Sequence, residues 1–210
     1  AIPTNSDLII KFHDINKIHN RIKDFEWWKE LKSMKIFNEN ITMLSELNKR
    51  YNMGSIFHNK TVYLSSVLIG EQKNNFLFIT SISDSQENLN KLFRTTHSSE
   101  NKSKNYDGIT INNLTIKLEN GKRRSVFFSI HKNIFLLSFS EIIIQESIRQ
   151  IKSKNDLFKL NPIEKLDQNL PKYSDINILV KTQFSEKIIG QQNIFLNANT
   201  WSWFDLELEE

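Results

Sequence analysis

One phrase of this sequence occurs twice, and it constrains the architecture more than any other feature. Both copies read apolar-Pro-x-x-Ser-Asp, then an apolar β-rich run, then Lys, and they begin at Ile2 and Leu170. Because a repeated phrase marks the start of a repeated structural unit, we expect a first unit over residues 1–169. A second unit begins over residues 170–210 and packs onto the same domain. The repeat also indicates that the chain is cut from a longer protein.

The apolar run in each phrase predicts a strand, at Leu8–Phe12 and at Ile176–Val180. If the phrase marks equivalent units, the two strands should occupy comparable places in one sheet. They are expected to be either adjacent or related by pseudo-symmetry.

Two amphipathic helices are expected after the first strand, because apolar residues recur there at steps of three and four. Their ranges are 15–31 and 37–51. The side chains expected to be buried against the sheet are Ile18, Ile22, Phe25, Leu44 and Leu47. Truncating Phe25 to Ala is therefore expected to cost about 3–5 kcal/mol, as for buried aromatic residues generally.

Strand-like alternation dominates the rest of the chain, interrupted by short helical patterns. The expected strands are 61–68 and 76–82 as a hairpin, then 109–118, 125–131 and 134–139 as a meander, and finally 194–208. Further helices are expected after Ser83, after Ser140 and from Pro162. Short turns join most neighbouring strands. We therefore predict an α+β fold: a mainly antiparallel sheet with amphipathic helices packed on one face, opened by the repeated strand–helix unit.

The segment 95–107 has no aliphatic residue and many Ser, Asn and Lys residues. Such a segment buries too little surface to offset its ordering entropy. It is expected to be an exposed, mobile loop that tolerates deletion at little cost.

No catalytic or metal-binding pattern is found. The chain has no Cys, which excludes disulfides, Cys-ligated zinc and thiol nucleophiles. None of the five His has a partner at the helical zinc spacing, so surface or capping roles are the favoured interpretation. Nucleophile-elbow, phosphate-loop and dinucleotide motifs are missing from the sequence. We expect no catalytic residue, no metal and no cofactor, and thus not an enzyme.

The candidate contact residues are basic or aromatic. Lys122, Arg123 and Arg124 form one compact basic cluster beside an Asn-Gly turn, which together with Lys102 and Lys104 is a candidate patch for an anionic polymer. The favoured alternative is a solvated hairpin tip that discourages edge pairing. A net charge of +4 without a basic stripe argues against nucleic acid as a partner.

Tryptophan pairs supply the other candidates. Trp27 and Trp28 are helical neighbours, about 100° apart, so one packs in the core and the other lies at its boundary. Trp201 and Trp203 lie two apart and share a face on a strand. That face is a candidate contact with a neighbouring unit, whereas a tryptophan at the core edge is the commoner structural role.

Two function classes follow. The first is a non-enzymatic interaction domain that binds a partner protein or a surface polymer. The alternative is a carrier of an apolar ligand, held between helices and sheet in a cavity of about 300 Å³ or more.

At Ile2–Asp7, at Trp28-Lys29-Glu30-Leu31 and over Ser138–Ile148, the chain resembles a family of bacterial cell-envelope proteins of unknown function. Those proteins are large, often lipid-anchored, and begin soon after an export signal with a Pro-x-x-Ser/Ala strand phrase. The resemblance covers most of the chain. It implies an extracytoplasmic location, in the periplasm or on the outer surface, and an N-terminal fragment of a larger protein. The implied partners are the rest of the same polypeptide or an envelope protein, with membrane attachment only through a lipid anchor. It implies no activity and no functional residues.

Overall fold

The structure, a computed structural model, describes residues 1–14, 18, 25–33, 35–51, 57–69, 73–82, 102–118, 121–154, 157–159, 163, 174–181 and 201–208. The side chains of Trp27, Leu31, Ile36, Lys73, Asn74 and Lys159 lie outside this description. The helix expected after Ser83 lies outside the described residues. Most of the residues in the helices expected from Pro162 and over 15–31 also lie outside them.

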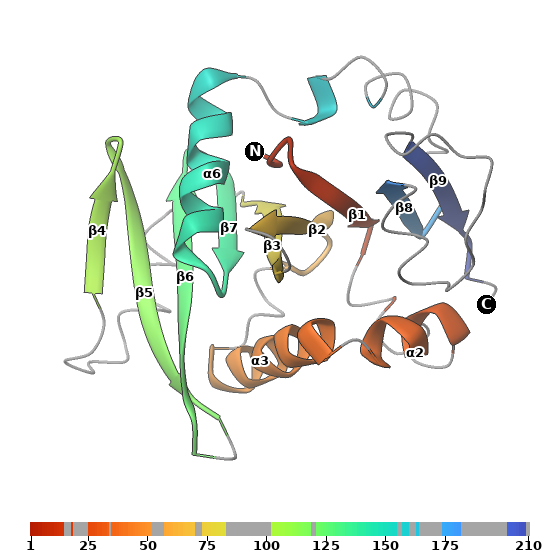
Figure 1. Ribbon diagram of the computed structural model, residues 1–210, viewed down its shortest axis with the longest axis horizontal. Helices are drawn as coiled ribbons and strands as arrows, with labels where there is room; N and C mark the ends of the chain where they lie inside the picture. Colours follow the sequence, from red (N-terminus) through yellow and green to blue (C-terminus); the bar gives the residue numbers. More distant parts are fainter. Residues whose placement is uncertain are drawn as a thin grey trace.

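A single nine-stranded sheet organises the described chain, in the order β4-β5-β6-β7-β3-β2-β1-β8-β9 (Figure 1). Every neighbouring pair is antiparallel, which confirms the predicted sheet type. The strands are β1 (Ser6–Phe12), β2 (Val62–Ile69), β3 (Lys73–Ser81), β4 (Lys102–Tyr106), β5 (Ile109–Lys117), β6 (Arg123–His131), β7 (Ile134–Ser138), β8 (Ile176–Lys181) and β9 (Trp201–Leu206). The helices are α2 (Glu26–Ser33), α3 (Lys35–Tyr51) and α6 (Glu141–Ser153), with a short 3-10 helix η1 (Leu157–Lys159).

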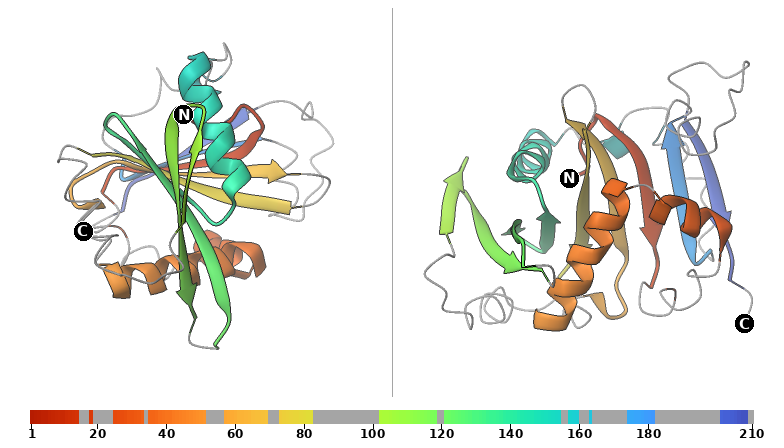
Figure 2. Two further views of the ribbon diagram at one scale, coloured as in Figure 1. Left: turned by 90° about the vertical axis from the view of Figure 1, so that its left-hand side faces the viewer. Right: turned by 60° about the horizontal axis from the view of Figure 1, so that its bottom comes forward.

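The helices cover both faces of the sheet (Figure 2). One core cluster joins α2 and α3 to the sheet, and a second joins α6 to the opposite face. The expectation of helices on one face therefore describes only α2 and α3. It is wrong for α6 because that helix buries a stripe of its own, Ile143, Ile144 and Ile148, against strands whose other face is already covered.

Aromatic packing fills the interface between α3 and the sheet. The Phe37 ring contacts Trp28 of α2 and Phe76 of β3 edge to face, with ring centroids 5.3 Å apart in both pairs. This geometry places the positive ring edges over negative ring faces. Phe37 is thus the centre of the helix–sheet contact.

The five positions expected in the core differ in their burial. Ile18 and Leu47 are buried as predicted, Leu44 is partly buried, and Ile22 lies outside the described residues. The prediction for Phe25 is wrong, because 40% of its surface is exposed. Phe25 precedes α2, and its carbonyl accepts hydrogen bonds from the amides of Trp28 and Lys29. At a helix start, its side chain is not on the stripe that faces the sheet.

Most strand predictions are confirmed, including the β2–β3 hairpin, the β5–β6–β7 meander and the strand at 176–180. The prediction of a loop over 95–107 is wrong for residues 102–106, because these residues form β4 and pair with β5 along their length. An edge strand is held by backbone hydrogen bonds and needs no apolar side chains. Residues 95–101 lie outside the described part.

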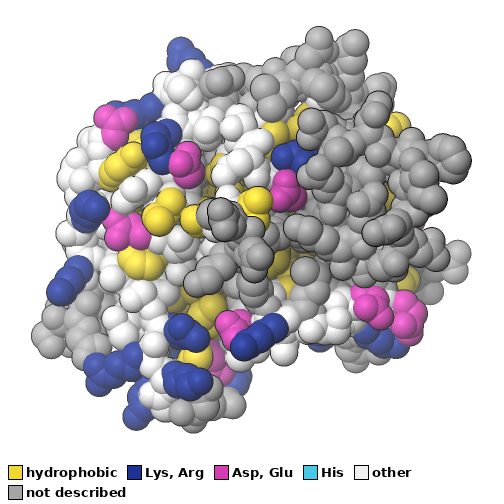
Figure 3. Space-filling model, in the orientation of Figure 1, with side chains coloured by type: hydrophobic (Ala, Val, Ile, Leu, Met, Phe, Trp, Pro, Cys, Tyr) yellow, Lys and Arg dark blue, Asp and Glu magenta, His cyan; other side chains and the backbone are white. Residues whose placement is uncertain are grey.

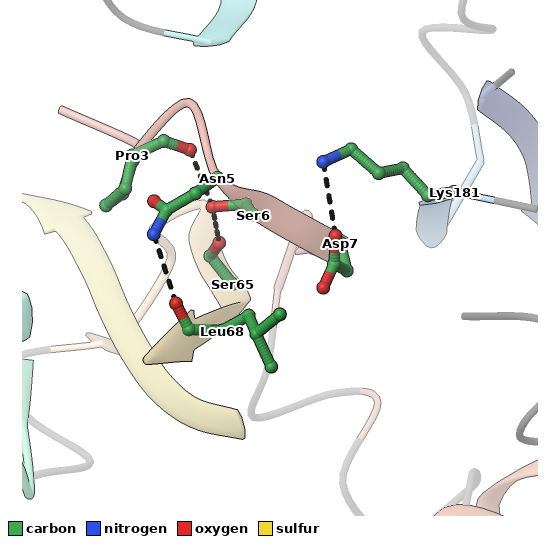
Figure 4. A network of polar contacts seen from close by, with 7 residues as sticks. All are labelled: Pro3, Asn5, Ser6, Asp7, Ser65, Leu68 and Lys181. Carbon is green, nitrogen blue, oxygen red and sulfur yellow. Dashed lines mark hydrogen bonds and ion pairs between the residues drawn. The ribbon is translucent and has the colours of Figure 1, made fainter. Parts of the chain in front are cut away.

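The first Pro-x-x-Ser-Asp phrase fastens β1 to both of its neighbours (Figure 4). The Ser6 hydroxyl donates to the Pro3 carbonyl at 2.7 Å and accepts from the Ser65 hydroxyl of β2 at 2.8 Å. On the other side, the Asp7 carboxylate pairs with the Lys181 ammonium of β8 at 3.1 Å. Both side chains of the pair are mostly shielded from water, so the phrase positions three strands at once.

Candidate functional site at the β9 edge

Strand β9 is one edge of the sheet and exposes aromatic side chains. Among the described strands it pairs only with β8, over six positions from Lys181 opposite Trp201 to Ile176 opposite Leu206. Trp203 is 42% exposed and Phe204 is 50% exposed. An edge strand with large apolar residues is a template for adding another strand.

The two faces of β9 differ. Trp201 and Trp203 stand opposite Lys181 and Leu179, on the face that α6 covers further along the sheet, so the shared face predicted for them is confirmed. Phe204 stands opposite Ile178, on the face of α2 and α3. The Lys181 ammonium lies 5.4 Å from the centroid of the Trp201 ring, a cation–π distance. Trp201 is half-buried and packs against the core cluster on the α6 side, which leaves Trp203 and Phe204 as the accessible pair.

A polar network anchors β9 to β8 and β1. The fully buried Asn177 of β8 donates from Nδ2 to Asp205 Oδ1 of β9, at 2.6 Å, and to the Ser174 hydroxyl. Its Oδ1 lies 2.7 Å from His13 Nε2, at the end of β1. Since a carboxylate only accepts, the amide nitrogen must face Asp205, and the amide oxygen then requires a proton on His13 Nε2. His13 is therefore a structural donor.

The second Pro-x-x-Ser-Asp phrase also holds β9. Asp175 accepts the backbone amide of Leu208 at 2.8 Å through its carboxylate, and its own amide donates to the Leu206 carbonyl at 3.0 Å. These bonds fix the end of β9. The polar contacts of Asn177 and Asp175 thus hold β9 beside β8.

The opposite edge of the same sheet is protected. Strand β4 carries four exposed side chains in five residues, among them Lys102 and Lys104, and no large apolar residue before Tyr106. A short edge strand with lysines resists unwanted pairing. Of the two edge strands, β9 is therefore the one whose side chains favour pairing with another strand.

The basic cluster lies elsewhere, at the tip of the β5–β6 hairpin. Figure 3 shows Lys and Arg side chains along the lower left of the molecule. Lys122, Arg123 and Arg124 are exposed there, and Arg123 stands opposite Lys117. The Arg50 guanidinium of α3 donates to the Lys117 carbonyl and adds a further cation. Lys102 and Lys104 do not join this cluster, because Lys102 pairs with Asn113 further along β5.

Lys104 instead forms an ion pair with Glu141 at the start of α6, at 3.0 Å. The Lys104 hydrogen bond lowers the pKa of the Glu141 carboxyl from its ordinary value of 4.5, against a smaller opposing effect of burial. Asp107 likewise pairs with Lys152 at 3.0 Å. These acidic residues at element ends thus have structural partners.

The lowered Glu141 pKa predicts a pH-dependent stability. The pair stabilises the fold above the unfolded-state pKa, and this contribution is lost as the pH falls through the lower folded-state pKa. Because Lys104 is 61% and Glu141 33% exposed, Glu141→Gln should cost only about 0.2–1 kcal/mol at neutral pH. Urea unfolding should show this difference narrowing on acidification. A difference that widens instead would contradict the assignment, and Lys104→Gln should move the Glu141 titration back toward 4.5.

Trp27 lies in α2, but its side chain is outside the described part, so its expected boundary position stays a prediction. Sequence reasoning missed Phe204, Asn177 and His13. The signal for Asn177 was present: a single amide inside the apolar run Ile176–Val180 requires a buried polar partner.

Within the described part of the chain, His, Asp and Glu side chains nowhere gather in threes that could hold a metal ion. Among the described helices, none combines the length and apolar character needed to cross a membrane. Comparison of the chain with models of protein families, with curated proteins and with solved structures gave no match.

Proposed function

We propose that this chain is a non-enzymatic interaction domain that binds its partner by strand addition at the β9 edge. The observation that carries the proposal is the exposure of Trp203 and Phe204 on an edge strand. In strand addition the main-chain hydrogen bonds supply affinity, and the alternating side chains supply specificity. Exposed aromatic residues are the usual anchors of such contacts.

The alternative, a carrier of an apolar ligand, is less well supported. A carrier needs space between its helices and its sheet. Here Phe37, Trp28 and Phe76 pack ring against ring at that interface, and the residues around them are buried. The contacts favour a solid core and a surface function.

We also propose that β8 and β9 open a second structural unit, as the repeated phrase predicts. Ile10 and Ile178 each lie seven residues after the proline of their phrase. They are direct partners in the β1–β8 pair. β1 then pairs with β2, and β8 pairs with β9, both antiparallel. Residues 170–210 would thus build on the sheet of residues 1–169.

We further place this domain in a bacterial cell envelope, as part of a larger exported protein. The support is the resemblance of its opening phrase, Ile2–Asp7, to those of envelope proteins, together with the second copy of that phrase. Extracytoplasmic location and a lipid anchor would both be visible in the full-length open reading frame, as an export signal before Ala1.

Peptides with the sequences of the chain's own strands test the binding function. We expect at least one of the β1, β2, β3 and β8 peptides, fluorescently labelled, to bind the protein in an anisotropy titration. The double variant Trp203→Lys, Phe204→Lys should weaken that binding by at least about tenfold, since it removes the anchors and places charge on the edge.

The matched control is Arg123→Ser, Arg124→Ser at the exposed hairpin tip, which should bind as the unaltered protein does. If none of the four peptides binds, or if the lysine variant binds as well as the control, the β9 edge is not an acceptor and the proposal is wrong. Circular dichroism of both variants checks that they remain folded.

A further inference from the structure

We propose that the strand added at β9 pairs with β9 in the way that β3 pairs with β2. This equivalence fixes the direction of the added strand, its residue register and the chemistry of its side chains. The occupant is an extended peptide that runs antiparallel to β9, with large apolar side chains on the α2–α3 face and basic side chains on the α6 face. This inference rests on the strand-accepting function proposed above.

The register argument begins at the β1–β8 pair. Ile10 and Ile178 are equivalent positions that face each other directly, so a local two-fold axis runs between them. Ile10 stands opposite Leu64 of β2, and Ile178 stands opposite Phe204 of β9. The axis therefore relates Leu64 to Phe204 and β2 to β9. β2 is covered on its far side by β3, whereas β9 has no described neighbour there.

The apolar requirement follows from the residues of β3. Phe78 stands opposite Leu64, and Phe76 stands opposite Ser66. The two-fold axis relates Leu64 to Phe204 and Ser66 to Leu206. The residue of the added strand at the place of Phe78 therefore faces Phe204, and the one at the place of Phe76 faces Leu206. Phe204 is half exposed and Leu206 only partly buried. Two large apolar side chains, two residues apart, would cover both.

The requirement for basic side chains follows from the positions at which β9 and β2 carry different residues. On the α6 face, β2 carries Tyr63, Ser65 and Val67, all uncharged. The equivalent positions of β9 and the residue after it are Trp203, Asp205 and Glu207, and Glu207 is exposed. Opposite charges directly across a strand pair are stabilising. The incoming strand therefore carries Lys or Arg at the places of Leu77 and Asn75.

A second copy of this chain is a poorer occupant. Neither β9 nor Glu207 after it contains a cation, so β9 pairing with β9 leaves both carboxylates without a partner of opposite charge. Centred on Phe204, such a pairing puts Asp205 opposite Trp203 and Glu207 opposite Trp201. The charge pattern favours a foreign basic strand.

Three peptides test the chemistry by anisotropy titration. The first has the sequence of β3, Lys73–Ser81. The second carries Asn75→Lys and Leu77→Lys and thus follows the inferred pattern. The third has the composition of the second with residues 76 and 77 exchanged and residues 78 and 79 exchanged, which moves both Phe side chains to the α6 face. We expect the second to bind about three- to tenfold more tightly than the first, with the advantage falling at high salt. The third should bind least.

Disulfide trapping tests the register, because the chain has no Cys of its own. Directly opposite residues on antiparallel strands have Cα atoms about 4.5–5.5 Å apart, within the range that a disulfide spans. Protein with Phe204→Cys should therefore cross-link to the basic peptide with Phe78→Cys at least about tenfold faster than to peptides with Phe76→Cys or Thr80→Cys.

The outcomes separate the two proposals. If the peptides bind but the exchanged peptide binds equally well, or if trapping prefers position 76 or 80, the inferred occupant is wrong while strand addition stands. If Phe204→Cys protein forms disulfide dimers that the basic peptide does not suppress, a second copy occupies the edge and the inference is overturned. If no peptide binds, the proposed function itself fails.

Discussion

Replacing Phe37 with Ala is expected to lower the free energy of unfolding by about 3–5 kcal/mol, as for other fully buried aromatic residues. Phe37 is almost completely buried, and its ring contacts both Trp28 and Phe76 at 5.3 Å. Truncation removes both edge-to-face contacts and leaves a cavity between α3 and the sheet, whose cost adds to the lost transfer free energy. Urea unfolding followed by circular dichroism measures the effect.

The matched control is Phe25→Ala, which removes the same side chain from a position that is 40% exposed. Its cost should be below about 1 kcal/mol, as for surface substitutions. Equal losses for the two variants would show that Phe25 contributes to the core as much as Phe37 does. From the sequence alone, the loss of about 3–5 kcal/mol was expected at Phe25, which its exposure contradicts.

The wrong prediction for Phe25 shows what apolar periodicity can and cannot predict. Apolar spacing over residues 37–51 correctly predicted α3 and its buried Leu47. The apolar spacing over residues 15–31, however, continues without a break across Glu26, the residue at which α2 begins. A residue just outside a helix no longer follows the helical phase, so Phe25 cannot be assigned to a face from its spacing.

The β4 strand was missed for a different reason. Strand prediction relies on apolar alternation, and Lys102–Tyr106 has none because its side chains are solvated at an edge. Its five backbone pairs with β5 depend on the neighbouring strand. Likewise, α6 gave a clear amphipathic pattern after Ser140, but a pattern does not say which face of the sheet the stripe will cover.

The candidate site was predictable in part. The spacing of Trp201 and Trp203 correctly placed them on one face of a strand. That β9 would be an edge depends on strand order, and strand order arises from pairings between residues far apart in the sequence. The repeated phrase came nearest to predicting it, since it predicted that β1 and β8 lie in one sheet, where they are adjacent.

Replacing Asn177 with Ala is expected to lower the free energy of unfolding by about 2–4 kcal/mol, although no apolar contact of comparable size is lost. Asn177 is fully buried and serves three groups: His13, Ser174 and Asp205. Truncation leaves all three without this partner in a site of low water access, and an unsatisfied buried group costs more than its hydrogen bond contributed.

The Asn5→Ala variant is the matched control, because the Asn5 side chain is exposed and its amide nitrogen donates a hydrogen bond to the Leu68 carbonyl at 3.1 Å. It should cost less than about 1 kcal/mol. Amide hydrogen exchange adds the sharper readout. In Asn177→Ala the amides of β9 should lose protection first, because Asp205 is the side chain through which this network holds the edge strand. If β9 stays protected while the whole domain is destabilised uniformly, Asn177 supports the core in general, and the network does not position the β9 edge.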